Sequence, residues 1–383
     1  MDAYYQQLNT LLKHIGTGMP QLIVDVAALN HNLVITQQQI PHSLHPRLVV
    51  KSLACMALLQ HCATQLKTQR YMLFHFAHLK TLFESMPQAD VLFGKPMPIQ
   101  ALNHTDKAFL QATQLQVQWL IDSEQRLGQY LKFAEQHQLC LRINIEIDVG
   151  LHRGGLKTIN ELKAILDVIV RHPQHLKFSG LMGYDAHVAK IPRLIQSAEQ
   201  TYQLSQQSYQ QFKAYVQQRY PTLCDEHTCW NGGGSPSFSF HCQQSVCNEV
   251  SFGSMLLKPA DFELKALHAF QNALWIATPV LKVLPRTELP QLEWLSRWAK
   301  SQAVFIYGGY WRGNYVYPQG SQPHGLYGRS SNQELVQIPQ TSSIEVDDYV
   351  FLRPAQSEMI IPQFAQLWWY QADRLMAFET FRE

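Results

Sequence analysis

Lys51 is the residue whose surroundings most clearly suggest covalent chemistry. It follows the apolar run Leu48–Val50 and precedes Ser52. Barrel enzymes carry their catalytic side chains at the C-terminal ends of buried parallel strands, so an amine at this position could form a Schiff base with a carbonyl group. A lysine at a strand end can also extend its ammonium group into water without any catalytic role. The run alone does not decide between these interpretations.

Polar residues alternate with isoleucines in the segment 142–156. Asn144, Glu146 and Asp148 would share one face of a strand, and in a barrel that face could point into the lumen beneath a ligand. The glycines that follow allow close approach of the backbone to a bound group, and Arg153 offers a planar donor for an anionic or phenolic oxygen. The alternative is a surface loop with a solvated arginine. The number of polar positions favours the ligand-binding interpretation.

Tyr184 and His187 follow another apolar strand, in the segment Gly180–His187. A neutral imidazole at such a strand end could stack on an aromatic cofactor or relay a proton. The chain contains 17 histidines, so any one of them can equally be structural. Tyr184 and His187 are candidate site residues because they lie just past a predicted strand.

A glycine-rich turn comes directly after the strand-like Cys229–Trp230. Gly232, Gly233 and Gly234 are followed by Ser235, and such a turn of exposed N–H groups suits a phosphate. The segment lacks the GKS or GKT ending of a Walker loop and does not match GxGxxG, which argues against an ATPase. A plain flexible loop is the alternative.

A second small, polar turn lies about twenty residues later, with Gly253 and Ser254 at its end. The last two loops of a barrel often build a phosphate site together, so the two turns support each other. A Schiff-base lysine, a phosphate site on late loops and a polar strand together imply pyridoxal 5'-phosphate as cofactor. Its ring would act as an electron sink for a carbanion at Cα.

The overall composition is that of a globular enzyme. The chain has 383 residues, of which 46% are hydrophobic and 16% charged. This length favours two domains, and the hydrophobic content argues against disorder. The formal net charge is +2, from 31 basic and 29 acidic residues without long runs of one sign. We therefore expect neither nucleic acid nor a membrane as a partner.

The N-terminal residues show no export signal, and no window approaches about 18 uninterrupted apolar residues. Seven cysteines fit reduced thiols better than a disulfide framework, so we expect a cytoplasmic protein. Two C-x4-C pairs could be drawn as a zinc site, although their spacing is wider than that of a usual zinc knuckle. These residues are Cys224, Cys229, Cys242 and Cys247.

Short apolar runs alternate with helix-like stretches up to about residue 260. Asn160–Arg171 has apolar residues at helical spacing, and Ile195–Tyr220 is long and polar, as in a solvent-facing helix. About eight strands in this βα alternation predict a closed parallel (β/α)8 barrel of the TIM type. The predicted strands are Leu22–Val26, Leu48–Val50, Tyr71–Phe76, Val91–Phe93, Trp119–Ile121, Leu141–Ile147, Phe178–Met182 and Cys229–Trp230.

After residue 261 the chain shows strands and turns with little helical periodicity. The predicted strands there are Ala273–Leu284, Ala303–Gly308, Ser343–Arg353 and Ala365–Tyr370. We therefore predict an α/β protein with a cofactor-binding barrel at 16–260 and a mainly antiparallel β domain at 261–383. Residues 1–15 could pack on the β domain.

These segments, in this order, resemble the pyridoxal-phosphate enzymes of the alanine-racemase-like barrel, known as fold type III. The similarity is specifically to the branch containing D-threonine aldolase and eukaryotic-type D-serine dehydratase. It covers about residues 20–260 and is looser in the β domain. The motifs that carry it are Pro20–Asp25 with Leu29 and Asn32, Val49–Ser52, Glu146–Gly150 with Arg153–Gly155, Gly183–Tyr184 with His187, Gly232–Pro236, and Glu249 with Gly253–Ser254.

By this resemblance Lys51 forms the internal aldimine and is the catalytic base on the face where a D-amino acid presents its Cα proton. Arg153 matches an arginine near the cofactor's phenolic oxygen, and His187 matches a histidine close to its ring, with Tyr184 as a further catalytic candidate. Family members are homodimers in which the β domain of one subunit closes the other's active site. The implied phosphate-binding residues are Gly232, Gly233, Gly234, Ser235, Gly253 and Ser254.

The chain departs from the family in the β domain. The aldolase and dehydratase carry a proline followed by His-x-Cys or His-x-Asp, which binds a divalent metal near the substrate hydroxyl. Here the corresponding stretch is Arg353–Glu358, with Gln356 and Glu358 at the ligand positions. Both could still hold Mg or Mn through oxygen, but a zinc site of the dehydratase kind is not expected. We assign no metal ligands.

The resulting prediction is a pyridoxal-phosphate-dependent lyase acting at Cα of a D-amino acid, as an aldolase or dehydratase. Loss of the metal pair gives weight to an amino-acid racemase instead, because a metal assists reactions at the β-hydroxyl. A non-catalytic cofactor-binding protein and a sugar-phosphate aldolase that uses Lys51 without the cofactor are further alternatives. Racemisation needs a second base, and the candidates are Tyr310, Tyr315, Tyr317 and Tyr327.

Overall fold

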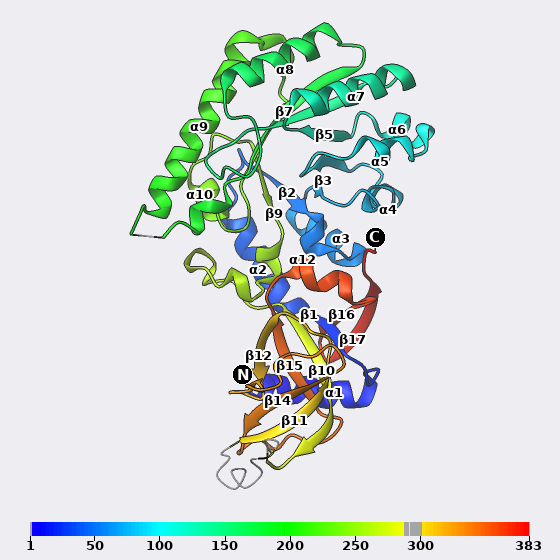
Figure 1. Ribbon diagram of the computed structural model, residues 1–383, viewed down its shortest axis with the longest axis vertical. Coiled ribbons are helices and arrows are strands. Elements are labelled where there is room, and N and C mark those ends of the chain that lie inside the picture. Colours follow the sequence, from blue (N-terminus) through cyan, green and yellow to red (C-terminus); the bar gives the residue numbers. More distant parts are fainter. Residues whose placement is uncertain (1, 193, 287–290, 292–300, 383) are drawn as a thin grey trace. The chain divides into compact units, whose positions relative to one another are not determined.

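The protein is described by a computed structural model that covers residues 2–192, 194–286, 291 and 301–382 (Figure 1). Its contacts divide the chain into two compact units. We call them the barrel unit, made of Ile35–Lys51, Leu58–Gly253 and Arg382–Glu383, and the β unit, made of Met1–Val34, Ser52–Ala57 and Ser254–Phe381.

The barrel unit contains a closed barrel of parallel strands, which confirms the predicted architecture. Pairing of the first strand with the last closes the barrel, with Arg47 opposite Ser251. The eight strands are β2 (His45–Val49), β3 (Arg70–Leu73), β4 (Asp90–Phe93), β5 (Val117–Ile121), β6 (Leu141–Glu146), β7 (Leu176–Gly183), β8 (Cys229–Gly232) and β9 (Glu249–Phe252).

Helices connect the barrel strands, and α2 leads into the first of them from a strand of the other sheet, β1 (Gln21–Asp25). In α8 the side chains at 162, 165, 166 and 169 are buried on one face, and a capping box of Thr158 and Glu161 fixes its start. The connecting helices are α2 (Val26–Gln39), α3 (Met56–Leu66), α4 (His78–Ser85), α5 (Ile99–Asn103), α6 (Lys107–Thr113), α7 (Glu124–His137), α8 (Ile159–Arg171), α9 (Ala198–Arg219) and α10 (Phe238–Gln243), with the short 3-10 turns η1 (Val50–Leu53), η2 (Ala186–Ala189) and η3 (Pro221–Leu223).

One predicted barrel strand was wrong. The run Leu22–Val26 forms β1 (Gln21–Asp25), which pairs antiparallel with β10 and parallel with β16 in the sheet of the β unit. The eighth barrel strand is instead β9, within the segment that the sequence suggested was a polar turn. An apolar run does not reveal which sheet buries it, whereas β9 carries Glu249 and Ser251 because these polar residues face a polar lumen.

The β unit contains a mainly antiparallel sheet, as predicted, with nine strands among the described residues. Besides β1, these are β10 (Leu274–Leu284), β11 (Ser301–Tyr307), β12 (Gly313–Tyr317), β13 (Gln322–Pro323), β14 (Gln333–Pro339), β15 (Tyr349–Pro354), β16 (Gln366–Gln371) and β17 (Arg374–Glu379). The unit also holds α1 (Asp2–Ile15), α11 (Ser254–Leu257), α12 (Ser357–Ile360), η4 (Ala260–Phe262), η5 (Lys265–Leu267) and η7 (Ile361–Gln363).

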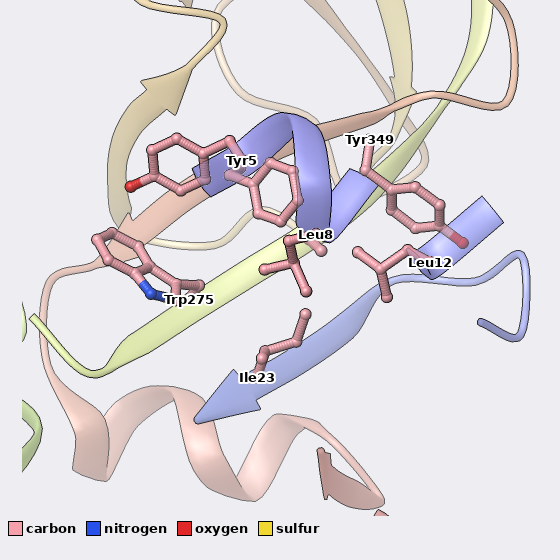
Figure 2. Close-up of a cluster of buried hydrophobic side chains, with 8 residues drawn as sticks. Tyr5, Leu8, Leu12, Ile23, Trp275 and Tyr349 are labelled. Atoms are coloured by element: carbon pink, nitrogen blue, oxygen red, sulfur yellow. The ribbon is translucent and has the colours of Figure 1, made fainter. Parts of the chain in front are cut away.

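Helix α1 packs on this sheet. Its residues Tyr5, Leu8 and Leu12 recur at helical spacing and are fully buried. Figure 2 shows them against side chains of β1, β10 and β15, namely Ile23, Trp275 and Tyr349. Burial of each large apolar side chain contributes roughly 1.5–3 kcal/mol, so α1 is part of the core of the β unit.

The N-terminal end of the barrel lumen is filled by paired ions. Arg47 of β2 has 0% exposure and donates to Asp90 of β4 (2.7 Å) and to Glu249 of β9 (2.7 Å). Because β4 lies two strands from β2, this side chain reaches it through the barrel interior. Arg142 adds a second cation at Asp90 (2.9 Å), and Arg70 adds one at Glu249 (2.9 Å). Both carboxylates are therefore neutralised from two sides.

Uncharged groups complete the same network. Gln118 donates to Asp90 (2.9 Å) and accepts from Asn144 (3.1 Å). The Cys229 thiol donates to Glu249 (3.1 Å), and its burial raises its pKa. The seven cysteines are free thiols. Cys229 therefore belongs to the lumen network.

Candidate active site

The predicted site residues of the barrel unit lie directly after the C-terminal ends of barrel strands. Lys51 comes two residues after β2, Tyr184 follows β7, Gly233 follows β8, and Gly253 follows β9. The strands are parallel and closed, so these ends form one rim. The structure thus brings to one end of the barrel residues that are up to about two hundred positions apart in the chain.

Lys51 lies beside an aromatic ring at this rim. Its Nζ is 4.2 Å from the centroid of the Phe74 ring, and the side chain is partly buried in η1. Phe74 follows β3 directly and was not singled out from the sequence, although its place one residue after a strand is a usable signal. The pKa of the adjacent His75 is lowered by burial and by the cations of Lys95 and Lys51. The ring of Phe74 shields one side of the amine from water.

The Tyr184 ring contacts both Arg153 and the glycine-rich turn, which the sequence analysis predicted to be parts of the site. The guanidinium carbon of Arg153 is 4.7 Å from the centroid of the Tyr184 ring. A Cβ added to Gly234 would lie 3.0 Å from Tyr184 Cε2, so the glycine-rich turn packs on the same ring. Arg153 and the turn are therefore held near each other through one aromatic side chain.

Glu146 ends β6 just below Arg153. It is 8% exposed, and its carboxylate is 3.4 Å from where a Cβ of Gly154 would lie. Burial raises the pKa of Glu146 to about 7, with Arg153 acting in the opposite direction. The sequence marked this residue as polar and inward but gave no reason to expect a carboxyl that titrates near neutral pH.

Asp148 shapes the turn that carries Arg153. Its carboxylate accepts from the N–H groups of Gly150 and His152 (3.0 Å each) and bonds the His152 ring (2.7 Å). Gly150 has φ +111, and a Cβ there would lie 3.1 Å from His187 Nε2. A glycine is required at this position because of both the backbone angle and the neighbouring ring.

His187 presents a neutral ring with one unused nitrogen. Its Nε2 lies 3.2 Å from Ser205 Oγ, whereas its buried Nδ1 has no hydrogen-bond partner in the described part of the chain. Burial lowers the pKa of this imidazole, although Asp185 and Asp148 oppose the shift. A buried ring atom without a partner is typical of a position completed by a ligand.

One hydrogen bond joins the two late loops, and a second lies within the glycine-rich turn. Gly253 N–H donates to Ser235 Oγ (3.4 Å), and Gly234 N–H donates to Ser237 Oγ (3.2 Å). Gly233 has φ +81, and a Cβ there would lie 2.8 Å from Val250 Cγ2. Only glycine fits this turn, and the missing side chains let an anion approach the backbone.

The rim residues fit pyridoxal phosphate. A lysine can bond its aldehyde, an arginine and a neutral imidazole can contact its ring substituents and face, and a tight glycine-rich turn can accept its phosphate. The unpartnered Nδ1 of His187 and the cradle beside Gly233 and Gly234 are the structural observations that support this fit.

Ser254 lies in the β unit. So do Gln356 and Glu358, which occupy the positions of the expected metal ligands. Ser254 Oγ is 2.9 Å from Ser52 Oγ and 3.0 Å from Glu358 Oε2, while Gln356 donates to Asp261 (2.8 Å). Across the described ranges, no three or more His, Cys, Asp or Glu side chains gather as metal ligands. Glu358 and Gln356 thus contact Ser254 and Asp261, and we derive no step through a metal.

The four candidate tyrosines differ in their surroundings. Tyr315 donates to the buried carboxylate of Glu334, and burial together with this bond raises the pKa of Tyr315. Tyr317 stacks on Tyr5 in the core beneath α1. Tyr310 and Tyr327 are 67% and 53% exposed. Tyr315 and Tyr317 are partly buried, so Tyr310 and Tyr327 are the most exposed of the four.

Comparison with known proteins identifies the barrel. The family model for the alanine racemase N-terminal domain matches residues 24–260. The 3-hydroxy-D-aspartate aldolase of Paracoccus denitrificans (strain Pd 1222) is 26% identical over 219 residues, covering 54% of this chain and 53% of the relative. The chain thus matches about half the length of this curated relative.

Solved structures share the fold of both parts. The D-threonine aldolase from Filomicrobium marinum has a TM-score of 0.74 at 15% identity, covering 94% of this chain and 96% of that one. The D-threo-3-hydroxyaspartate dehydratase from Delftia sp. HT23 has a TM-score of 0.71 at 14% identity, covering 95% and 97%. Within the described residues, no helix is long and apolar enough to cross a membrane.

Proposed function

Since the chain belongs to the family of the alanine racemase N-terminal domain, we propose that it is a pyridoxal-phosphate-dependent enzyme acting at Cα of a D-amino acid. The observation that carries this proposal is the position of Lys51. It lies at the barrel rim with Tyr184 and the glycine-rich turn, each directly after a strand. When bound, the cofactor supplies an electron sink for the pair of electrons left at Cα.

Each rim residue has a distinct task in this proposal. Lys51 Nζ would hold the cofactor through its aldehyde and would serve as the base for a proton of the substrate. The Phe74 ring keeps water from one side of that amine. Arg153 orients the cofactor through its donor fork, held by the ring of Tyr184. His187 contributes a neutral face, because burial lowers its pKa.

A lyase acting on a β-hydroxy-D-amino acid is the more specific proposal. The names of the aldolases and the dehydratase reported above support it, because each refers to a D-amino acid with a hydroxyl group on Cβ. Cleavage of the Cα–Cβ bond and loss of the hydroxyl would both begin from the substrate held beside Lys51. The two reactions differ in which proton the base removes. Removal of the Cα proton lets the hydroxyl gain a proton and leave as water, whereas removal of the hydroxyl proton lets the Cα–Cβ bond break and an aldehyde leave.

An amino-acid racemase is the second candidate. It needs a base on the opposite face of the substrate, and a residue offered to another subunit must be exposed in the single chain. Tyr310 and Tyr327 meet this requirement, whereas Tyr315 is bonded to Glu334. A homodimer with shared active sites is part of both candidates.

A screen of amino acids tests the proposal. The protein with pyridoxal phosphate is incubated with the D- and L-forms of threonine, serine, 3-hydroxyaspartate and alanine, with and without divalent metal. Ammonia, aldehyde and enantiomer ratio are scored separately. A lyase releases ammonia or aldehyde from D-forms only, and Lys51→Ala abolishes it.

A racemase would instead change only the enantiomer ratio, including that of alanine, and Tyr310→Phe or Tyr327→Phe would stop it. The matched control is Tyr315→Phe, which changes a tyrosine already bonded within its own chain. No turnover of any D-amino acid, or equal turnover by Lys51→Ala, contradicts the proposal. Turnover of a sugar phosphate without pyridoxal phosphate would support the aldolase alternative.

A further inference from the structure

A buried chain of hydrogen bonds lies beneath the glycine-rich turn. Asp185, which follows Tyr184, is 2% exposed and accepts from Ser237 Oγ (2.5 Å) through Oδ1. Its other oxygen, Oδ2, is 2.8 Å from Nε2 of His241, which is 1% exposed. The chain therefore connects the loop after β7 with helix α10.

Ser237 connects this carboxylate to the backbone of the turn. Its hydroxyl donates to Asp185 and accepts from Gly234 N–H (3.2 Å), and its own N–H donates to the Gly234 carbonyl (3.0 Å). The direction in which Gly234 presents its backbone is thus determined by a side chain that Asp185 holds in place.

The His241 ring forms the floor of the same turn. A Cβ added to Gly232 would lie 3.1 Å from His241 Cε1, and one added to Gly233 would lie 3.0 Å from His241 Cδ2. Both ring nitrogens are engaged, since Nδ1 lies 2.9 Å from Ser245 Oγ. A ring bonded at both nitrogens cannot rotate, so it gives the glycines a fixed surface to pack on.

Burial of this carboxylate is unfavourable unless its partners compensate. Among the described residues its ion-pair partner is His241, and no lysine or arginine forms an ion pair with it. Removing one member of such a pair leaves a charge or donor without a partner. By contrast, carboxylates at the N-terminal end of the lumen are each neutralised by two arginines.

We propose that Asp185 and His241 are positioning residues that hold the glycine-rich turn in the conformation that binds the phosphate of the cofactor. This inference rests on the proposed function. The pair acts through Ser237, Gly233 and Gly234 and does not touch the reacting atoms. Its effect must therefore depend on whether the ligand carries a phosphate.

Binding of pyridoxal phosphate and of pyridoxal, which lacks the phosphate, separates this role from a general structural one. Dissociation constants are measured by absorbance for the full-length protein and for Asp185→Asn. A charge-assisted hydrogen bond contributes about 1.5–3 kcal/mol, so we expect the variant to bind pyridoxal phosphate roughly tenfold to a hundredfold more weakly. Affinity for pyridoxal remains within about twofold of the wild type.

Ser237→Ala is a milder second variant in case Asp185→Asn does not fold. It removes one hydroxyl, and we expect a smaller loss in the same direction. Thr68→Val is the matched control, because Thr68 is a buried hydroxyl that accepts from Arg70 N–H and donates to Pro46 at the opposite end of the barrel. It should change neither dissociation constant.

The binding measurements distinguish failure of the positioning role from failure of the proposed function. Unchanged binding of pyridoxal phosphate by Ser237→Ala and Asp185→Asn overturns the positioning role, as does equal weakening for both ligands. If the wild-type protein binds neither ligand, the proposed function itself fails. A tenfold or greater loss confined to the phosphorylated ligand supports the inference.

Discussion

The charged side chains at the two ends of the barrel differ in their burial and in their partners. At the N-terminal end Arg47 is fully buried, and its partners Asp90 and Glu249 each receive a second arginine. At the C-terminal rim Arg153 is exposed and Glu146 is buried with a pKa of about 7. At the N-terminal end each carboxylate of the network is paired with two arginines, whereas at the rim the buried Nδ1 of His187 has no hydrogen-bond partner among the described residues.

This difference indicates where the barrel is built for stability and where for binding. Buried polar groups in proteins usually find partners, and exceptions gather at functional sites. The network of the N-terminal end spans β2, β4, β6 and β9, so it fixes the closure of the barrel. The rim residues instead stand on strand ends that this network holds in register.

Replacing an arginine with methionine at each end should give the largest difference in the free energy of unfolding. Arg47→Met leaves the buried Glu249 and the partly exposed Asp90 with one cation fewer, and we expect a loss of about 3–5 kcal/mol in the free energy of unfolding. Arg153→Met removes an exposed cation, and we expect a change within about 0.5–1 kcal/mol. Urea unfolding of the cofactor-free protein measures both.

Only Arg153→Met should weaken binding of pyridoxal phosphate in a folded protein. Equal destabilisation by the two substitutions would mean that the ends of the barrel do not differ as described.

The pH dependence of stability should carry a signature of Glu146. Its folded-state pKa is raised from 4.5 to about 7, so folding takes up a proton and stability falls as pH rises through this window. Glu146→Gln removes this loss, and we expect the variant to be about 1–3 kcal/mol more stable than the wild type at pH 8. The advantage should vanish near pH 4. A constant difference between pH 4 and 8 would contradict this account.

The contribution of Asp90 to stability should change with pH in the opposite direction. Burial raises the pKa of Asp90, but Arg47 and Arg142 outweigh it and lower the pKa from 3.8 to about 2. Its contribution to stability is present above 3.8 and is lost as pH falls toward 2. From this shift we expect Asp90→Asn to be about 2 kcal/mol less stable near neutral pH, with the gap closing in acid. A gap that widens as pH falls would rule this out.

The rim was more predictable from sequence than the N-terminal network. Lys51, Tyr184 and Gly233 follow apolar strands, and position after a strand end is a local signal. Arg47 lies in the unremarkable segment His45–Val49, and its partners are up to about two hundred residues away, so no local pattern pairs them. For the same reason the sequence could not assign β1 to its sheet, because its partners β10 and β16 lie hundreds of residues later.

The relation of Asp185 to His241 was also beyond the sequence. Their spacing of 56 residues becomes a hydrogen bond only because β7 and β8 are neighbours in the barrel.

Covalent trapping of the cofactor tests the central claim most directly. The purified protein is incubated with pyridoxal phosphate, reduced with borohydride, digested and analysed by mass spectrometry. The account predicts a single stoichiometric modification on the peptide containing Lys51, and its absence from a folded Lys51→Ala variant. Lack of incorporation, or equal incorporation by the variant at other lysines, would contradict the assignment of this rim as the active site.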